Sequence, residues 1–252
     1  MDLGLDNRVY IVTGGSRGLG RATARELVGN GARVVVSSRS QESLDACVAE
    51  LGASAATAVA ADNADPETPP RLVSQALEQY GRLDGALVSV GGPPAGPILG
   101  KSDEQWREAF ESIFLGALRL AAAVADEVEA GGSIAFVLST SAKQPIPGLG
   151  MSNGIRPGLA MAAKSLADEL GPRGVRVNGL LPGRVNTERV QELDALTEDP
   201  EETKRAHLQT IPLRRYGRPE EFGKAAAFLL SPASDYITGV MLPVDGGLTR
   251  PL

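Results

Sequence analysis

The chain has 252 residues, 42% of them hydrophobic, and a formal net charge of −6, which suits one α/β domain spanning residues 1–252. No long run of Lys or Arg indicates a nucleic-acid or membrane partner, no apolar run reaches the roughly 20 residues that span a bilayer, and the first residues do not resemble a signal peptide. The single cysteine, Cys47, lies on an apolar helical stripe, which indicates packing, and suits a reducing compartment, so we expect a cytoplasmic protein and assign no metal site.

The first predicted elements surround a glycine-rich turn. Residues 9–12 form an apolar run that predicts a buried strand, and the apolar spacing after it predicts a helix ending near residues 30–31. Between them lies Thr13-Gly14-Gly15-Ser16-Arg17-Gly18-Leu19-Gly20. Glycines in such a turn allow positive φ angles and a close approach to a pyrophosphate, which the N-terminus of the helix attracts. The turn therefore predicts a dinucleotide site.

Strands and helices alternate along the rest of the chain. Apolar runs predict further strands at 34–36, 56–60, 86–90, 134–138, 175–181 and 240–244. Helices are predicted between a Ser40 cap and Gly52, from Pro66 to Gly81, after a Ser102 and Gln105 capping box, at about 157–170 and at 219–230. Continuous apolar strands separated by helices imply a doubly wound parallel sheet with helices on both faces.

The end of the second predicted strand bears on the choice of cofactor. An acidic residue there binds the ribose 2′-hydroxyl of NAD, but this sequence has Ser38 and Arg39, with Arg17 in the glycine-rich turn nearby. A hydroxyl and a guanidinium suit a 2′-phosphate, which a carboxylate repels. The sequence therefore favours NADP(H) over NAD(H), although Arg39 on its own is equally typical of a solvated surface.

These motifs resemble the short-chain dehydrogenase/reductase family over nearly the whole chain. The likeness rests on Thr13-Gly14-x-x-x-Gly18-x-Gly20, on Asp62 after the third strand, on Pro182-Gly183 after the sixth and on Val244-Asp245-Gly246-Gly247 near the end. It implies a Rossmann-like fold and a hydride transfer between NADP(H) and a carbonyl or alcohol, as in 3-oxoacyl-carrier-protein reductases. It also implies a small-molecule substrate, a lid over about residues 187–212, and a homotetramer formed through two long helices and the last strand.

The resemblance assigns a set of cofactor-binding positions. They are Gly14, Ser16, Arg17, Gly18, Leu19, Gly20, Ser38, Arg39, Asp62, Asn63, Gly91, Arg156, Pro182, Gly183, Val185 and Thr187. The residues near Val185 and Thr187 correspond to those that hold the nicotinamide carboxamide. For Asp62, a hydrogen bond from the adenine amine and a simple cap of its own loop are both open.

The catalytic positions depart from the family pattern. The family has Tyr-x-x-x-Lys in the helix after the fifth strand, and these positions fall on Ser152 and Arg156. Ser139, thirteen residues before Ser152, stands where the family has its catalytic serine, and Ile113 stands where it has a relay asparagine. Halohydrin dehalogenases also carry Arg at the lysine position, but they keep the tyrosine and lose the dinucleotide motif, which is the reverse of this chain. We assign Ser139, Ser152 and Arg156 as the catalytic positions.

The missing phenol has a chemical consequence. A phenol has a pKa near 10 that a neighbouring cation lowers, whereas an aliphatic hydroxyl is a much weaker acid. Arg156 can still bind the nicotinamide ribose, but the acid role has no obvious successor. His207 in the lid is either a proton donor or solvated surface. On the substrate side, the remaining polar candidates are Lys143, Ser141 and Asn153.

Two functions remain open from the sequence. One is an NADP(H)-dependent oxidoreductase with a rearranged site, and the other is an NADP(H)-binding sensor or scaffold without redox turnover. Residues 91–96 and 139–148 are rich in Pro, Gly and hydroxyls, which indicates loops shaped for a ligand. We therefore favour the oxidoreductase, largely on the analogy of fold.

Overall fold

A computed structural model describes residues 1–250 and shows a parallel α/β sheet. Within those residues, seven strands follow the order β3-β2-β1-β4-β5-β6-β7, and each pairs in parallel with its neighbours. The strands are β1 (Val9–Thr13), β2 (Arg33–Ser38), β3 (Ala56–Ala60), β4 (Gly85–Val88), β5 (Ser133–Val137), β6 (Arg176–Pro182) and β7 (Met241–Val244). The order reverses between β1 and β4, which places a ligand crevice outside the carboxyl ends of these strands. The predicted fold class is confirmed.

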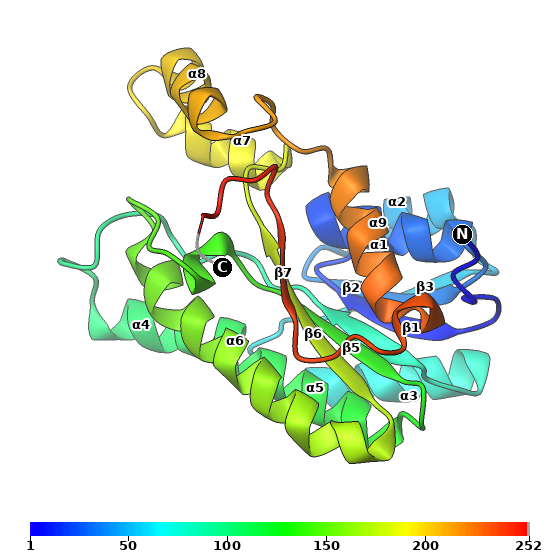
Figure 1. Ribbon diagram of the computed structural model, residues 1–252. Helices are drawn as coiled ribbons and strands as arrows, with labels where there is room; N and C mark the ends of the chain where they lie inside the picture. The colour runs from blue at the N-terminus through cyan, green and yellow to red at the C-terminus, as the bar shows by residue number, and fades with distance from the viewer. Residues whose placement is uncertain (251–252) are drawn as a thin grey trace.

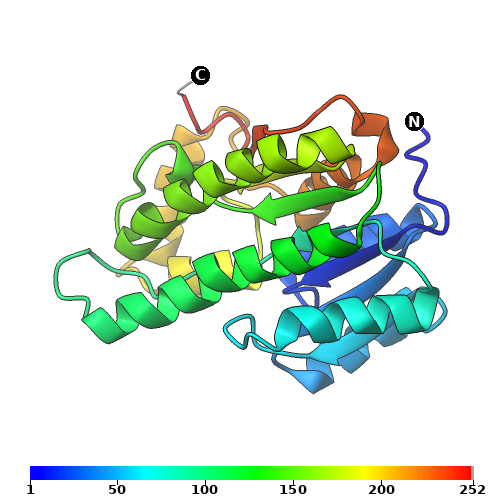
Figure 2. The same ribbon diagram turned by 90° about the horizontal axis from the view of Figure 1, so that it is seen from below.

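Helices cover both faces of the sheet (Figures 1 and 2). One face is covered by α1 (Gly18–Gly29), α2 (Gln41–Leu51) and α9 (Pro219–Leu230), and the other by α3 (Thr68–Tyr80), α5 (Gly116–Glu127) and α6 (Gly150–Leu170). Successive side chains of β1 point to opposite faces of the sheet. Val9 and Ile11 pack on the face covered by α3, α5 and α6, and Tyr10 and Val12 pack on the other face. Among the helices of residues 1–250, none is long and apolar enough to cross a membrane.

Several predicted helix ends are confirmed. The Ser40 side chain accepts a hydrogen bond from the Ser43 N–H, and Gly52 and Gly81 end α2 and α3. Ser102 and Gln105 form the predicted capping box at the start of α4 (Asp103–Phe110). The α3 helix begins at Thr68 rather than in the turn that contains Pro66, because Pro69 and Pro70 occupy its first positions, where the missing N–H groups cost nothing.

Three helical segments differ from the sequence prediction. The α6 helix begins at Gly150, so Pro157 lies inside it rather than at its start. The long helix after Ser102 is interrupted between α4 and α5 by a π-helical turn, Glu111–Leu115. The polar segment predicted between residues 187 and 210 contains two helices, α7 (Glu188–Ala195) and α8 (Pro200–Thr210), which lie beyond the end of β6 (Figure 1). Both are polar on most faces, and their apolar periodicity is correspondingly weak.

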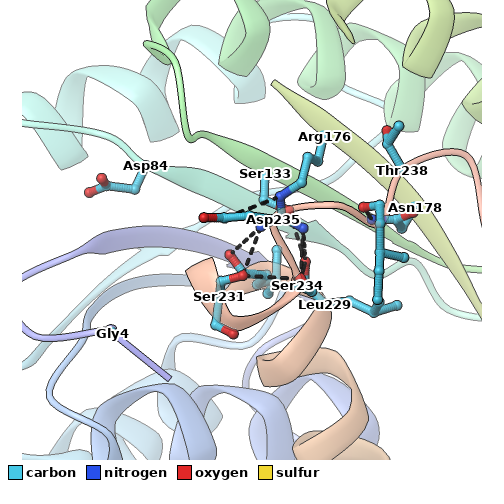
Figure 3. A network of polar contacts seen from close by, with 12 residues as sticks. Gly4, Asp84, Ser133, Arg176, Asn178, Leu229, Ser231, Ser234, Asp235 and Thr238 are labelled. Carbon is cyan, nitrogen blue, oxygen red and sulfur yellow. Dashed lines mark hydrogen bonds and ion pairs between the residues drawn. The ribbon is translucent and has the colours of Figure 1, made fainter. Parts of the chain in front are cut away.

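A buried arginine fastens α9 to the end of the sheet that lies opposite the crevice (Figure 3). Arg176, on β6, donates to the Leu229 carbonyl at 2.7 Å, to the Ser234 hydroxyl at 2.8 Å and to the Ser231 carbonyl at 2.9 Å. These carbonyls belong to the last turn of α9 and the residue after it, so the guanidinium acts as a C-terminal cap. These contacts give Arg176 a structural role at the end of the sheet opposite the crevice.

Candidate active site

The glycine-rich turn after β1 has the geometry of a dinucleotide cradle. Gly14 and Gly18 have φ angles of 58° and 54°, which favour glycine. A Cβ at Gly14 would lie 2.9 Å from the Ser89 carbonyl oxygen, and one at Gly20 would overlap the Gly14 carbonyl. The turn is therefore packed so closely that only glycine fits at these positions. This is the backbone that a pyrophosphate requires for a close approach.

The N-terminus of α1 is open to an anion. Arg17 is its N-cap residue, and within residues 1–250 its side chain forms no capping hydrogen bond to the first turn. The first N–H groups of α1 and the positive end of its dipole therefore suit a phosphate. Thr13 joins β1 to the end of β4 by donating to the Ser89 carbonyl at 2.9 Å and accepting from the Ser89 N–H at 2.8 Å. Cys47 is fully buried beneath this turn, in agreement with the packing role expected for it.

The residues assigned to the adenine half lie at the ends of β2 and β3. Ser38 is half-buried and Arg39 exposed, and no ion pair of Arg39 occurs among the described residues. Arg17 points toward α7, where its guanidinium lies 3.9 Å from the Glu192 carboxylate, so it does not pair with Ser38 or Arg39 within residues 1–250. Asp62 accepts from the Ala64 N–H at 2.9 Å, the loop cap that the sequence left open. The carbonyl of the next residue, Asn63, packs against Gly116 of α5.

Three serines are linked by hydrogen bonds between the carboxyl end of β5 and the first turn of α6. The Ser139 hydroxyl accepts from the Ser141 N–H at 3.0 Å, and the Ser141 hydroxyl lies 3.1 Å from that of Ser152. Ser152 and Ser141 are buried, whereas Ser139 is half-buried. The structure thus links the predicted Ser139 and Ser152 through Ser141, which contacts Ser139 with its backbone N–H and Ser152 with its hydroxyl.

Arg156 lies one turn further along α6 and is 4% exposed. It donates to the Val137 carbonyl at the end of β5 at 2.7 Å and to the Val90 carbonyl after β4 at 3.2 Å. Burial lowers its pKa to about 10, so the guanidinium remains charged at neutral pH. Within residues 1–250 no carboxylate forms an ion pair with it. A buried cation with only carbonyl partners is stabilised by a ligand that presents oxygen atoms to it.

The position of the family's relay asparagine is apolar. Ile113 lies in the π-helical turn and is 2% exposed, in a cluster with Ala109, Met151 and Ile155 against which Trp106 packs. Trp106 is therefore a packing residue. No polar side chain occupies position 113, so a proton relay through this turn lacks its side-chain member.

Other titratable or polar side chains differ in their surroundings. Of the tyrosines, Tyr10 is buried and donates to the Leu230 carbonyl at 3.1 Å, whereas Tyr236 is fully exposed. The Asn153 side chain holds both the N–H and the carbonyl of Ile146, at 3.0 and 2.9 Å, so it braces a loop rather than facing a substrate. Lys143 is half-buried, and among the described residues it forms no ion pair.

The surroundings of His207 differ from both alternatives considered from the sequence, a proton donor over the site and a solvated surface residue. Its ring is half-buried and hydrogen-bonded on both nitrogens, to Arg184 at 2.9 Å and to Tyr216 at 3.1 Å. It is therefore neither a solvated surface residue nor a free acid over the site. The contacts join α8 to the segment after β6 and to the segment before α9, which periodicity in the sequence does not reveal.

The segment after β6 connects the crevice to the helices above it. Thr187 is the N-cap of α7, with its hydroxyl accepting from the Val190 N–H at 3.4 Å. It lies against Gly18 of the glycine-rich turn, where a Cβ would be 3.6 Å from the Thr187 methyl group. Arg189, which the sequence gave no reason to select, donates to the Pro93 carbonyl at 2.9 Å and so joins α7 to the loop after β4.

Comparisons with known proteins identify similar sequences along the whole chain. A family model described as enoyl-(acyl carrier protein) reductase matches residues 14–249. An uncharacterized oxidoreductase of Mycobacterium tuberculosis is 36% identical over 252 residues, which cover 98% of this chain and 94% of that protein. The human dehydrogenase/reductase SDR family member 4 is 36% identical over 249 residues, covering 96% of this chain and 88% of that protein. A 2,5-dichloro-2,5-cyclohexadiene-1,4-diol dehydrogenase of Sphingobium indicum is 35% identical over 97% of this chain and 98% of its own.

Solved structures show the same fold over the full chain. A short-chain dehydrogenase/reductase from Brucella melitensis superposes with a TM-score of 0.93 and 28% identity, with all of both chains covered. The L-sorbose reductase of Gluconobacter frateurii, complexed with NADPH and L-sorbose, superposes with a TM-score of 0.92 and 28% identity, again over both whole chains.

Proposed function

The chain belongs to the short-chain dehydrogenase/reductase family, and from that membership we propose that it is an NADP(H)-dependent oxidoreductase acting on a carbonyl or alcohol through a non-standard catalytic site. The observation that carries the proposal is Arg156, a buried guanidinium whose hydrogen-bond partners are two backbone carbonyls, one helical turn after Ser152. Burying a guanidinium costs desolvation free energy, which further oxygen atoms near it would offset. A nicotinamide ribose and a reacting carbonyl both supply such oxygen atoms.

The cradle residues divide between the parts of the cofactor. Backbone N–H groups from Ser16 to Gly20 hold the pyrophosphate, and Ser38 and Arg39 hold the 2′-phosphate. At the nicotinamide end, the proposed contacts are Gly91, Arg156, Pro182, Gly183, Val185 and Thr187. The bound cofactor supplies or accepts a hydride. The likeness to a reductase complexed with NADPH supports the preference for NADP(H).

The serine hydroxyls act on the substrate oxygen. Ser139 and Ser152 donate hydrogen bonds to it, and Ser141 orients Ser152 through their 3.1 Å contact. As the oxygen gains negative charge during reduction, these donors and the charge on Arg156 stabilise it. The last proton comes from water, because the phenol that would provide it in the family is replaced by Ser152.

The wider setting of the activity is also proposed. We place residues 187–212 over the substrate as a lid, and the protein in the cytoplasm, since its lone, buried cysteine suits a reducing compartment. We further propose a homotetramer formed through α4, α5, α6 and β7.

A substrate screen tests the proposal. The purified chain is mixed with NADPH or NADP⁺ and a panel of ketones, aldehydes and alcohols, and the nicotinamide absorbance is followed. Turnover that falls in Ser139→Ala and in Ser152→Ala supports the site. Tight NADPH binding without turnover on any member of the panel would favour a sensor or scaffold instead.

A further inference from the structure

Four side chains form a closed ring of hydrogen bonds beneath α7 and α8. Arg184 donates to Asp194 Oδ1 at 2.8 Å and lies 2.9 Å from His207 Nε2. His207 Nδ1 lies 3.1 Å from the Tyr216 hydroxyl, which donates to Asp194 Oδ2 at 3.0 Å. We call these four residues the lid ring. Each member has two partners in the ring, so the loss of one leaves others unsatisfied.

The chemistry of the ring fixes the state of His207. A guanidinium only donates, so His207 Nε2 must accept from Arg184. The ring proton of a neutral imidazole then sits on Nδ1, which donates to the Tyr216 oxygen. Tyr216 uses its own hydrogen for Asp194. Every donor in the lid ring therefore meets an acceptor only when His207 is neutral with its proton on Nδ1.

The lid ring sits where the crevice meets the helices above it. Arg184 comes after Gly183, just beyond the end of β6, and its backbone is tied to the segment before α9, because the Gly217 N–H donates to the Arg184 carbonyl at 2.9 Å. Asp194 is at the end of α7 and His207 in α8. Arg184 is followed by Val185 and Thr187, the proposed carboxamide contacts. The ring therefore couples both lid helices to the nicotinamide end of the site.

Burial and charge favour the forms that the ring needs. Burial, and then the charge of Arg184, lower the pKa of His207. Burial, and then the hydrogen bond to Asp194, raise the pKa of Tyr216 to about 12. The charged groups facing the imidazole are Arg184 from the segment after β6 and Asp194 from α7, whose Oδ1 is 3.9 Å from Nδ1. On α8 itself, Arg205 is exposed and paired with Glu202.

We propose that neutral His207 is a positioning residue that holds α7, α8 and residues 185–187 over the cofactor, and that its protonation in mildly acidic solution opens the lid ring. The cofactor half of this statement rests on the proposed function. Protonation places an N–H on Nε2, facing the Arg184 guanidinium, so two donors and two cations meet. Because folding favours the neutral form, the ring's contribution is complete above about pH 6.5, the ordinary histidine value, and is lost as the pH falls below it.

The first experiment examines His207 directly in the ligand-free protein. It is the one histidine of the chain, so its imidazole signals need no assignment in an untagged, histidine-labelled sample. We expect the Nδ1–H tautomer at neutral pH and a titration midpoint below about 6.5. The Nε2–H tautomer, or a midpoint at or above that value, would overturn the proposal.

The second experiment follows the lid by hydrogen exchange at pH 7.5 and pH 5.5, with the intrinsic exchange rate divided out at each pH. In the wild type, protection of residues 188–210 should fall at pH 5.5 by up to about tenfold, because the imidazole of the opened lid is then one pH unit below its ordinary pKa of about 6.5. His207→Gln keeps an acceptor for Arg184 but cannot titrate, so its protection should be the same at both pH values. Lys204→Gln, an exposed change on the same helix, should behave as the wild type. An equal fall in wild type and His207→Gln would contradict the proposal.

Cofactor affinity separates this inference from the proposed function. The NADPH phosphate itself titrates near pH 6, so wild type and His207→Gln are compared at each pH. The dissociation constant of the wild type should rise several-fold more between pH 7.5 and pH 5.5 than that of the variant. If neither protein binds NADPH, the proposed function fails while hydrogen exchange still decides the ring. If both bind with the same pH dependence, the coupling to the site is refuted.

Discussion

At the scale of single residues, Ser38 and Arg39 are the side chains to which we attribute the proposed preference for NADP(H) over NAD(H). Neither is acidic, and Arg39 is exposed and free of ion pairs among the described residues, so it is available to a phosphate. We expect NADPH to bind more tightly than NADH by about 10- to 100-fold, the effect of about 1.5–3 kcal/mol from a charged hydrogen bond. Arg39→Asp should erase or reverse this preference in a fluorescence titration.

A matched change tests whether the effect belongs to the site. Arg107→Asp alters an exposed arginine of α4 by the same charge and should leave the ratio of the two affinities unchanged. Equal wild-type affinities for NADPH and NADH would refute the assignment of Ser38 and Arg39.

The missing phenol gives a second prediction at the same scale. General acid catalysis contributes about 10²–10⁴-fold, so ordinary ketone reduction by the wild type should be slow by about that factor. Ser152→Tyr combined with Arg156→Lys restores the family pair and should raise the rate of carbonyl reduction, measured by NADPH oxidation. Ser139→Ala should lower any native activity, because Ser139 stands at the family's catalytic serine position and its side chain is half-buried, whereas Ser141 and Ser152 are buried.

The activity of serine variants decides this prediction. Each is first checked for NADPH affinity, which should stay near that of the wild type because the cradle is formed by other residues. Rapid turnover that survives both Ser139→Ala and Ser152→Ala would show that the chemistry lies elsewhere.

Sequence spacing locates some of these residues and not others. The resemblance to the family assigns Ser139, Ser152 and Arg156 to the catalytic positions. The role of Arg189 and the contacts of His207 could not be predicted in this way, because Arg189 contacts Pro93 across 96 positions of the sequence and His207 contacts Arg184 across 23. Such contacts depend on how loops and short polar helices pack, and no periodic pattern specifies that packing.

At the scale of elements, local signals are strong where a helix end has its own hydrogen bonds. The capping box of α4 is an example, since the Ser102 hydroxyl accepts from the Gln105 N–H at 3.2 Å and the Gln105 side chain accepts from the Ser102 N–H at 3.0 Å. Local signals mislead where tertiary contacts prevail. Pro157 reads as a helix start, yet α6 continues seven residues earlier because Met151 and Ile155 are buried in the cluster around Ile113.

The capping box can be tested through stability. Ser102→Ala removes the hydroxyl that satisfies the N–H of Gln105, and we expect a loss of about 0.5–2 kcal/mol in the free energy of unfolding. The measurement is a denaturant titration followed by circular dichroism. Ser74→Ala, an exposed position inside α3, is the control and should leave the stability unchanged or slightly higher, because alanine favours a helix. Equal effects of the two changes would show that the box adds nothing to the fold.

At the scale of the whole molecule, exposed apolar side chains occur at several places on the single chain, and two of these places lie on the elements proposed for assembly. Met161 on α6 is 65% exposed, and β7 forms the edge of the sheet with all four residues only half-buried. On α4, Phe110 is 43% exposed and stacks on Phe114 at 4.7 Å between ring centroids. A free edge strand and exposed aromatic rings are features that proteins usually cover. Two such places on different elements are what a tetramer with two kinds of interface requires.

We therefore expect a tetramer at micromolar concentration by light scattering, with each interface separable by one charge. Met161→Asp should disrupt the contact through α6 and β7, and Phe110→Asp should disrupt the contact through α4 and α5, because burying an unpaired carboxylate is costly. Each single variant should therefore be a dimer, and the double variant should be a monomer. Leu77→Asp places the same charge on α3, outside both regions, and should remain a tetramer. A monomeric wild type would refute the assembly. A tetramer that survives both changes would show that its interfaces lie elsewhere on the molecule.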